Sequence, residues 1–186
     1  VKVGETYTDY GDGNLEETEQ LYDMALSGKG FFAISYADRN GNESVRYTRD
    51  GNFTVNSQGV LVTKDGDFVL AEDGGLINIP EGVKISVDES GRITADGQEI
   101  AQLQLVDFED YNYLKKFGEN MYIAIDGATT TDAQCKVYQG YLEASNVNVV
   151  TEMVDMITIT RDYESNQKVI QTIDSTLEKS VALGRV

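Results

Sequence analysis

The sequence predicts a mainly β protein: an all-β meander domain followed by one long, coiled-coil-type C-terminal α-helix. Seventeen of the 18 glycines lie at or before Gly140, and those from Gly41 to Gly97 recur every six to ten residues. Most follow Asn, Asp, Ser or Gln, in dipeptides typical of tight turns. Short runs rich in β-branched and aromatic residues separate these turns, and they are typical of strands. By contrast, no proline or glycine occurs from Asn146 to Leu183.

Several of the runs between the glycines alternate with period two, as in Val83, Ile85 and Val87. This alternation is the pattern of strands with one buried face. We expect strands at 31–34, 45–48, 53–55, 60–62, 68–70, 76–79, 83–87, 100–108, 121–125 and 135–139. The stretch 109–120 is predicted to be a tyrosine-bearing loop with up to one helical turn. We assign these side chains to the β core: Leu26, Phe31, Phe32, Phe53 and Val55.

The last part of the chain reads as one helix of about 35 residues, or roughly 52 Å. Asn148 is the predicted N-cap, Glu152 complements the helix dipole, and Gly184 is the predicted stop. Side chains on one seam recur in alternating steps of four and three, which is typical of a coiled coil. The seam consists of Val149, Met153, Met156, Thr160, Tyr163, Gln167, Ile170, Asp174, Leu177 and Val181. A second flank adds Val150, Val154, Ile157, Val169 and Ile173.

Two interpretations of this helix stay open. It packs on its own β domain, or it packs on a helical partner outside this chain. A helix of roughly 52 Å would overhang a 144-residue domain about 30–35 Å across, which favours the partner. The polar seam members Gln167 and Asp174 predict a weak two-stranded coil at best.

Composition excludes several functions. The 186 residues include 32 acids, 15 bases and no histidine, for a net charge of −17, and 26 of the acids with 11 of the bases precede Ser145. This excess argues against binding to nucleic acid or an anionic membrane. Without histidine, Ser-His-Asp or Cys-His catalysis and a Cys/His zinc site are excluded. No apolar run is long enough to cross a membrane, and we predict no membrane insertion and no cofactor.

Candidate reactive groups are weak. The cluster Asp107, Glu109 and Asp110 is interpreted as a solvated loop, and the lone Cys135 as a small core side chain. We reject three further candidate sites. The run from Asp9 to Glu16 is not interpreted as a calcium loop, and Gly28-x-Gly30 is not interpreted as a dinucleotide site. Tyr111 with Tyr113 is not interpreted as a sugar-binding face. The segment Asp38 to Asn42 is interpreted as a hairpin turn. We therefore predict that the protein is not an enzyme.

Three stretches together carry a family signature. They are DMALSGKGFFAI at 23–34, YTRDGNFTVNSQGVLVT at 47–63, and QGYLEASNVNVVTEMVDMI at 139–157 followed by RDYESNQK at 161–168. In these stretches the sequence resembles the bacterial flagellar basal-body rod proteins of the FlgG and FlgF type, relatives of the hook protein. The motif positions are Gly30, Phe31, Phe32, Tyr47, Thr48, Arg49, Asp50, Gly51, Gly140, Leu142, Glu143, Ser145, Asn146 and Val147.

The resemblance implies an extracytoplasmic structural subunit of the flagellar basal body, exported through the type III apparatus without a cleaved signal peptide. Such subunits stack into a helical tube that transmits torque. Its β domains form an outer layer, and the C-terminal helix pairs with an N-terminal helix in the inner layer. That N-terminal helix is missing here, so 1–20 is expected to be the connector from it, 21–144 the outer domain and 145–186 the assembly helix. The implied partners are further copies of the chain and other rod and hook proteins.

We assign the assembly interface to apolar side chains along the helix: Val149, Met153, Met156, Ile157, Tyr163, Ile170, Ile173 and Leu177. The distal rod is the preferred assignment, with a proximal-rod or hook paralogue as the alternative; the short β domain argues against a hook protein. An alternative of another class is an acidic β binding module with an oligomerising stalk helix. That module would carry an exposed aromatic cluster and bind a ligand saturably.

Overall fold

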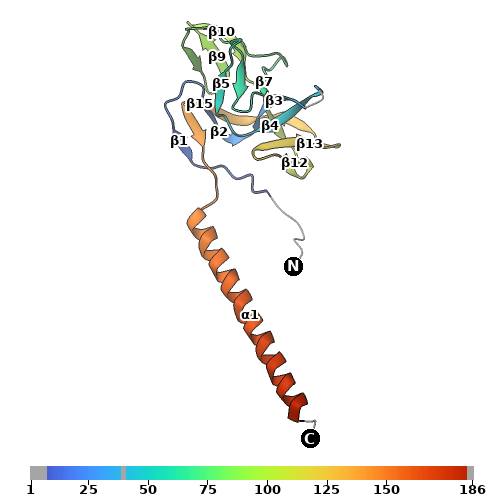
Figure 1. Ribbon diagram of the computed structural model, residues 1–186. Coiled ribbons are helices and arrows are strands. Elements are labelled where there is room, and N and C mark those ends of the chain that lie inside the picture. Colours follow the sequence, from blue (N-terminus) through green and yellow to red (C-terminus); the bar gives the residue numbers. More distant parts are fainter. Residues whose placement is uncertain (1–7, 39–40, 184–186) are drawn as a thin grey trace. The chain divides into compact units, whose positions relative to one another are not determined.

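The computed structural model describes residues 8–38 and 41–183, with helix side chains as far as 180 (Figure 1). The chain divides into two compact units between Ala144 and Ser145. The first unit is built from β-strands, and the second contains a single long α-helix. The predicted fold class is therefore confirmed.

The strands of the first unit are short and are linked by tight turns. In chain order they are β1 (Leu15–Glu17), β2 (Met24–Lys29), β3 (Phe31–Ala37), β4 (Glu43–Thr48), β5 (Phe53–Val55), β6 (Leu61–Thr63), β7 (Phe68–Val69), β8 (Ile85–Val87), β9 (Arg92–Ala95), β10 (Gln98–Gln102), β11 (Leu105–Phe108), β12 (Leu114–Phe117), β13 (Met121–Ala124), β14 (Thr130–Asp132), β15 (Gln134–Gln139) and β16 (Tyr141–Glu143). One 3-10 turn, η1 (Tyr111–Tyr113), precedes β12.

Within the described residues these strands form four antiparallel sheets. The largest has nine strands, in the order β12-β13-β4-β3-β7-β6-β5, with β11 paired to both β3 and β14. Smaller sheets join β10-β9-β8, β15-β2 and β1-β16. Hairpins join strands that are consecutive in sequence, as in the predicted meander. Pairs between strands distant in sequence, such as β2 with β15, connect the beginning of the β unit to its end.

The side chains expected in the core are confirmed there. Leu26, Phe32 and Phe53 belong to the main apolar cluster, and Val55 packs against it from its edge. Phe31 belongs to a second cluster with Phe108 and Leu114. The main cluster contains these buried residues: Met24, Leu26, Phe32, Phe53, Leu61, Val69, Ala71, Ile77, Ile79, Ile85, Ile93, Ala95, Leu103 and Val137.

Three expected segments differ from the structure. Residues 76–79 form isolated bridges, with Leu76 opposite Leu70, instead of a strand. The run 100–108 is interrupted at Leu103, which is buried and bridges to Ala71. The loop expected over 109–120 contains the anticipated helical turn, but β12 follows it. In β12, Leu114 is buried, and the backbone pairs with that of strand β13.

The helix α1 (Val149–Leu183) begins where the sequence predicts. The Asn148 carboxamide oxygen accepts hydrogen bonds from the amides of Val150, at 3.1 Å, and Thr151, at 3.3 Å, which confirms the N-cap. The predicted stop at Gly184 lies outside the described residues. No helix in the described part of the chain is long and apolar enough to cross a membrane.

Candidate functional site

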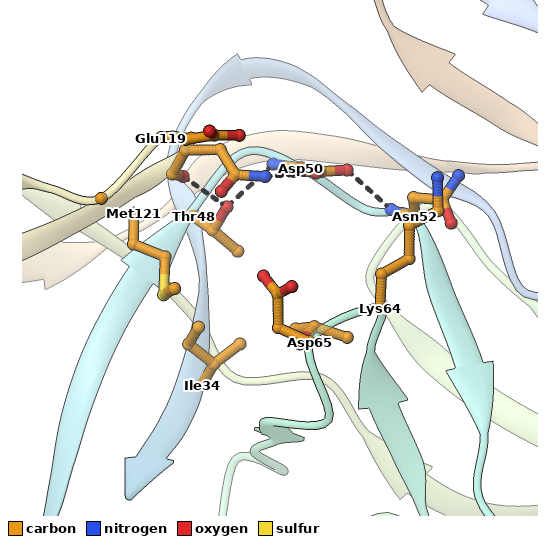
Figure 2. A pocket seen from close by; sticks show the side chains of 11 residues that line it. Ile34, Thr48, Asp50, Asn52, Lys64, Asp65, Glu119 and Met121 are labelled. Carbon is orange, nitrogen blue, oxygen red and sulfur yellow. Dashed lines mark hydrogen bonds between the residues drawn. The ribbon is translucent and has the colours of Figure 1, made fainter. Parts of the chain in front are cut away.

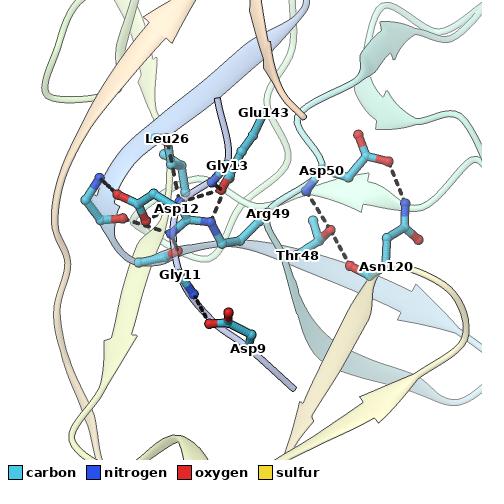
Figure 3. Close-up of polar contacts among 12 residues, drawn as sticks. Asp9, Gly11, Asp12, Gly13, Leu26, Thr48, Arg49, Asp50, Asn120 and Glu143 are labelled. Carbon is cyan, nitrogen blue, oxygen red and sulfur yellow. Dashed lines mark hydrogen bonds and ion pairs between the residues drawn. The ribbon is translucent and has the colours of Figure 1, made fainter. Parts of the chain in front are cut away.

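A single guanidinium, that of Arg49, joins several distant parts of the β unit (Figure 3). Arg49 directly follows β4, and its side chain forms a two-pronged ion pair with Glu143 at the end of β16. The Nε atom lies 2.8 Å from Glu143 Oε2, and Nη2 lies 3.1 Å from Oε1. Only 17% of the Arg49 side chain and 11% of the Glu143 side chain are exposed. The geometry is the strong, planar fork that arginine forms with a carboxylate.

The remaining donors of Arg49 bind two other segments. Nη1 donates to the carbonyl oxygens of Gly28, at 2.8 Å, and Gly30, at 3.1 Å, where β2 turns into β3. Nη2 also lies 3.0 Å from Asp12 Oδ1. Burial alone would lower the pKa of Arg49, but the hydrogen bond and charge of Glu143, together with Asp12, raise it above its usual value. Arg49 therefore stays charged.

Both carboxylates also bind backbone amides. Asp12 Oδ2 accepts from the amide of Gly28 at 3.1 Å, and Glu143 Oε1 accepts from that of Gly13 at 2.9 Å. Each acid thus contacts the guanidinium and a second chain segment. We call this network the arginine junction, and define it by Asp12, Gly13, Gly28, Gly30, Arg49 and Glu143.

Next to the junction, β1 pairs antiparallel with β16, with Leu15 opposite Glu143. The Ala144 amide extends the pairing by donating to the Asn14 carbonyl at 2.8 Å. A β-carbon on Gly13 would lie 1.7 Å from the Ala144 carbonyl oxygen, so only glycine allows this approach. The segment that enters the β unit therefore lies along the last strand before the helix.

Tyr10 anchors the same entering segment at its other end. Its ring lies 4.8 Å from that of Tyr111 and 5.5 Å from that of Tyr122, measured between centroids, and packs edge-on against Phe31. Asp107 is buried here and accepts a 2.7 Å hydrogen bond from the Tyr111 hydroxyl. Asp107 therefore belongs to a structural cluster, and its expected place in a solvated loop is wrong.

The turn after β4 lines a cavity of about 480 Å³ (Figure 2). The Thr48 hydroxyl donates to the Asn120 carbonyl at 2.7 Å and accepts from the Asp50 amide at 3.0 Å. The Asp50 carboxylate in turn accepts from the Asn120 side chain and from the Asn52 amide. A β-carbon on Gly51 would lie 1.6 Å from the carbonyl oxygen of Met24. These motif residues fasten the turn to the β12–β13 hairpin and to β2.

The second candidate site is the apolar face of α1. The eight side chains assigned to the assembly interface are between 52% and 67% exposed. Thr151, Thr158, Ser165, Thr172 and Lys179 recur every seven residues on the opposite face and are all polar. Several helix hydroxyls bind the carbonyl four residues earlier, for example Thr158 to Val154 at 2.9 Å. These polar positions define one face of the helix, and the eight apolar side chains assigned to the assembly interface lie on the other side of it.

The structure distributes the predicted motif positions over several places. It brings Gly30, Arg49 and Glu143 together in the junction, while Ser145, Asn146 and Val147 lie exposed between β16 and α1. Thr48, Asp50 and Gly51 form the turn after β4, and Gly140 forms the turn between β15 and β16. Phe31, Phe32 and Tyr47 belong to the two core clusters. Leu142 is half-buried in β16.

Sequence reasoning missed Asp12, Gly13 and Gly28 as junction residues. The glycine pair Gly28-x-Gly30 was the available signal. A β-carbon at Gly28 would lie 2.6 Å from the Gln134 carbonyl oxygen, and one at Gly30 would lie 2.8 Å from the Ala133 β-carbon, so glycines there allow the β2–β3 turn to pack against β15. Half-buried Cys135 packs against the main core, as predicted, and burial raises the pKa of its thiol. No group of three or more metal-ligating side chains is found among the residues that the structure describes.

The fold and these contacts define a class of protein: a β module in which one arginine joins distant segments, followed by a long helix that carries a stripe of apolar side chains. Comparison with known proteins specifies the class further. The family described as flagellar basal body rod FlgEFG protein C-terminal matches residues 138–183. The family described as flagellar hook protein FlgE/F/G D1 domain matches residues 25–95.

Whole proteins agree with these matches. The chain is 38% identical to the flagellar basal-body rod protein FlgG of Buchnera aphidicola from Schizaphis graminum, over 91% of this chain and 68% of that protein. It is 38% identical to the rod protein FlgF of Caulobacter vibrioides, over 92% of this chain and 67% of the relative. It is 33% identical to the flagellar basal-body rod protein FlgG of Bacillus subtilis, over 91% of this chain and 68% of that protein. The chain belongs to the flagellar basal-body rod protein family, as its resemblance predicted.

Proposed function

We propose that this chain is a subunit of the distal rod of the bacterial flagellum and polymerises with copies of itself into a helical, torque-transmitting tube. The observation that carries the proposal is the apolar face of α1, whose interface side chains are more than half exposed along the whole described helix. A stripe of this length is typical of helices that pack against other helices. The family match supports an axial structural role over the binding module.

The magnitudes favour a polymer over a simple pair. Covering the exposed half of eight apolar side chains contributes about 1 kcal/mol each, or roughly 8 kcal/mol. Association costs about 4–15 kcal/mol in lost freedom and side-chain ordering. One helix pairing is therefore marginal, and each subunit needs several contacts. A head-to-tail interface that does not close on itself supplies such repeated contacts.

The two units then have different roles. Residues 21–144 are proposed to form the outer layer of the tube, 145–186 the inner assembly helix, and 1–20 the connector to an N-terminal helix. The end of the proposed connector pairs with β16, beside the strand that leads into α1. Other rod and hook proteins are the proposed neighbours at the two ends of the polymer. The proposed location is the extracytoplasmic part of the basal body, reached by type III export.

Paired aspartates on the helix test the assembly role. Met156→Asp with Ile157→Asp, made in the complete native gene, should leave the β unit folded but abolish rods, because two charges enter the apolar face. Thr158→Asp with Ser165→Asp is the matched control, since it adds the same charge to the polar face. Electron microscopy of isolated basal bodies and a motility assay give the readout. Normal rods from the Met156 and Ile157 variant would refute the assignment.

Deletion of the gene tests the distal position. Basal bodies that keep a proximal rod stub but lack the distal rod and hook would support it. Rods that are missing from their base would indicate a proximal subunit, and intact rods lacking only the hook would indicate a hook paralogue. Normal flagella would contradict an axial role altogether.

A further inference from the structure

The Arg46 side chain on β4 lies over two aromatic rings of the largest sheet, those of Tyr36 on β3 and Phe117 on β12. Its guanidinium carbon lies 5.4 Å from the centroid of the Tyr36 ring and 5.0 Å from that of Phe117. The two rings contact each other edge-to-face at 5.2 Å. Such stacking fixes the plane of the guanidinium and leaves its edge for hydrogen bonding.

Among the described residues, this guanidinium has fewer polar partners than an arginine usually has. Its one hydrogen bond within the described residues runs from Nη1 to the Val45 carbonyl, at 3.1 Å. The Nε atom is buried and has no partner there. The other arginines described in the β unit each contact a carboxylate: Arg49 contacts Glu143 and Asp12, and Arg92 contacts Glu99. A stacked arginine that contacts no carboxylate in the described part of the chain is unexpected at a net charge of −17 and requires an explanation.

Strand register places a second cation on the same face of the sheet. Phe117 is opposite Met121 and Lys115 is opposite Ile123, and side chains two residues apart in a strand share a face. Lys115 is exposed and makes no ion pair with a described residue, and Ile123 is half-buried beside it. We call this surface the Arg46 face and define it by Tyr36, Arg46, Lys115, Phe117 and Ile123. It is an aromatic and apolar surface with two cations that form no ion pair with the residues the structure describes.

We infer that the Arg46 face is a contact surface between β units and binds carboxylates of a second copy of this chain. The inference rests on the proposed polymer and adds a second interface to it, separate from the helix. Charge complementarity selects the occupant, because residues 1–144 carry 26 acids against 11 bases, so a neighbouring copy presents mostly carboxylates. Aromatic and arginine side chains together are also the residue types that dominate binding energy at interfaces.

Zero-length cross-linking of the purified chain tests this contact. Equal amounts of ¹⁴N- and ¹⁵N-labelled chain are mixed and treated with a carbodiimide, which joins an amine to a carboxylate in contact. Lys115 should form amide links of mixed isotope mass, and the linked peptide identifies the acidic acceptor. The ion pair between Lys136 Nζ and Glu89 Oε2, at 2.6 Å, supplies an internal control, since its link joins residues of one chain and does not depend on association.

Two variants distinguish the contribution of the Arg46 guanidinium from the effect of the chain's net charge. Arg46→Ala should lower the yield of mixed-mass links at Lys115 about tenfold, the change expected when an anchor arginine is lost from an interface. Arg92→Ala also removes one positive charge, but that arginine already has Glu99 as its partner, so the yield should not change. Lys136–Glu89 links should stay constant in every variant, which would show that folding is intact.

The same experiment in the Met156→Asp, Ile157→Asp protein distinguishes this proposal from the helix interface. Mixed-mass links at Lys115 should persist there, because the Arg46 face does not involve α1. Absence of these links in both proteins would overturn the inference, whatever the outcome of the rod assays. A yield that Arg46→Ala leaves unchanged would overturn it as well.

Discussion

The arginine junction should be the main polar determinant of stability in the β unit, and Arg49→Met tests this directly. Methionine keeps much of the aliphatic volume but removes every hydrogen bond of the guanidinium. Glu143, which is 11% exposed, would then be left as a mostly buried, unpaired carboxylate. Removing one partner of a buried pair costs about 3–5 kcal/mol.

Partial exposure reduces this value. Asp12 is 48% exposed, so its ion pair contributes at most about 1 kcal/mol, and Arg49 itself retains some solvent contact. We therefore expect a loss of about 3 kcal/mol, near the lower end of the range for buried pairs. For a unit of this size the loss corresponds to a decrease in Tm of about 10 °C. Arg49→Lys should cost about 1–2 kcal/mol, because an ammonium cannot reproduce the planar fork.

Urea unfolding followed by near-UV circular dichroism gives the measurement. Ten of the eleven tyrosines precede Ser145, so the signal reports mainly on the β unit. A double-mutant cycle with Glu143→Gln should show a coupling energy of about 1.5–3 kcal/mol. Arg92→Met is the control, because Arg92 and Glu99 are 47% and 53% exposed and their pair should contribute under about 1 kcal/mol. A loss below about 1 kcal/mol for Arg49→Met, or additivity with Glu143→Gln, would refute the reasoning.

Two further predictions concern the neighbouring contacts. Gly13→Ala places a methyl group 1.7 Å from the Ala144 carbonyl oxygen. We expect the free energy of unfolding to fall by about 1–3 kcal/mol and hydrogen exchange to become faster in β1 and β16. Gly75→Ala is the control and should have a small effect, because its methyl group meets only the movable Asp73 side chain, at 3.0 Å. Equal exchange in both variants would contradict a close β1–β16 approach. Burial of Tyr111 and its hydrogen bond to Asp107 raise the pKa of the phenol from 10.0 to about 12, so its contribution to stability is complete below pH 10 and is lost as the pH rises through 12. The difference in unfolding free energy between wild type and Tyr111→Phe should therefore shrink over that range, and a constant difference would show that the shift is absent.

The local elements could be predicted because their causes are local. Turn glycines and alternating side chains indicated most strands of the β unit, and the Asn148 cap with an uninterrupted amphipathic stretch indicated α1. The expectation missed six strands: β1, β2, β9, β12, β14 and β16. In β12 the two central residues, Lys115 and Lys116, are charged and exposed. That strand is specified by its partner β13 and by the buried Leu114, which a single-strand pattern does not reveal.

The arginine junction could not be predicted for a different reason. Arg49 is 37 residues from Asp12 and 94 from Glu143, and the sequence offers 32 carboxylates as candidate partners. Nothing in residue spacing selects two of them. The family motif marked Arg49 and Glu143 as important positions, but their pairing follows from the β1–β16 and β2–β15 registers, which are set by tertiary packing. Predicting the pairing would have required those registers first.

The junction also bears on how load would pass between the two units of a rod subunit. The chain leaves the β unit after β16, and only residues 145–148 lie between the last backbone bond of the β1–β16 pair and the first turn of α1. Glu143 is therefore the last charged anchor before the helix. Through Arg49 it is bonded to the β2–β3 turn, and through Gly13 to the entering segment. A force applied to α1 would reach at least three backbone segments instead of one strand, and this distribution would be lost with the guanidinium.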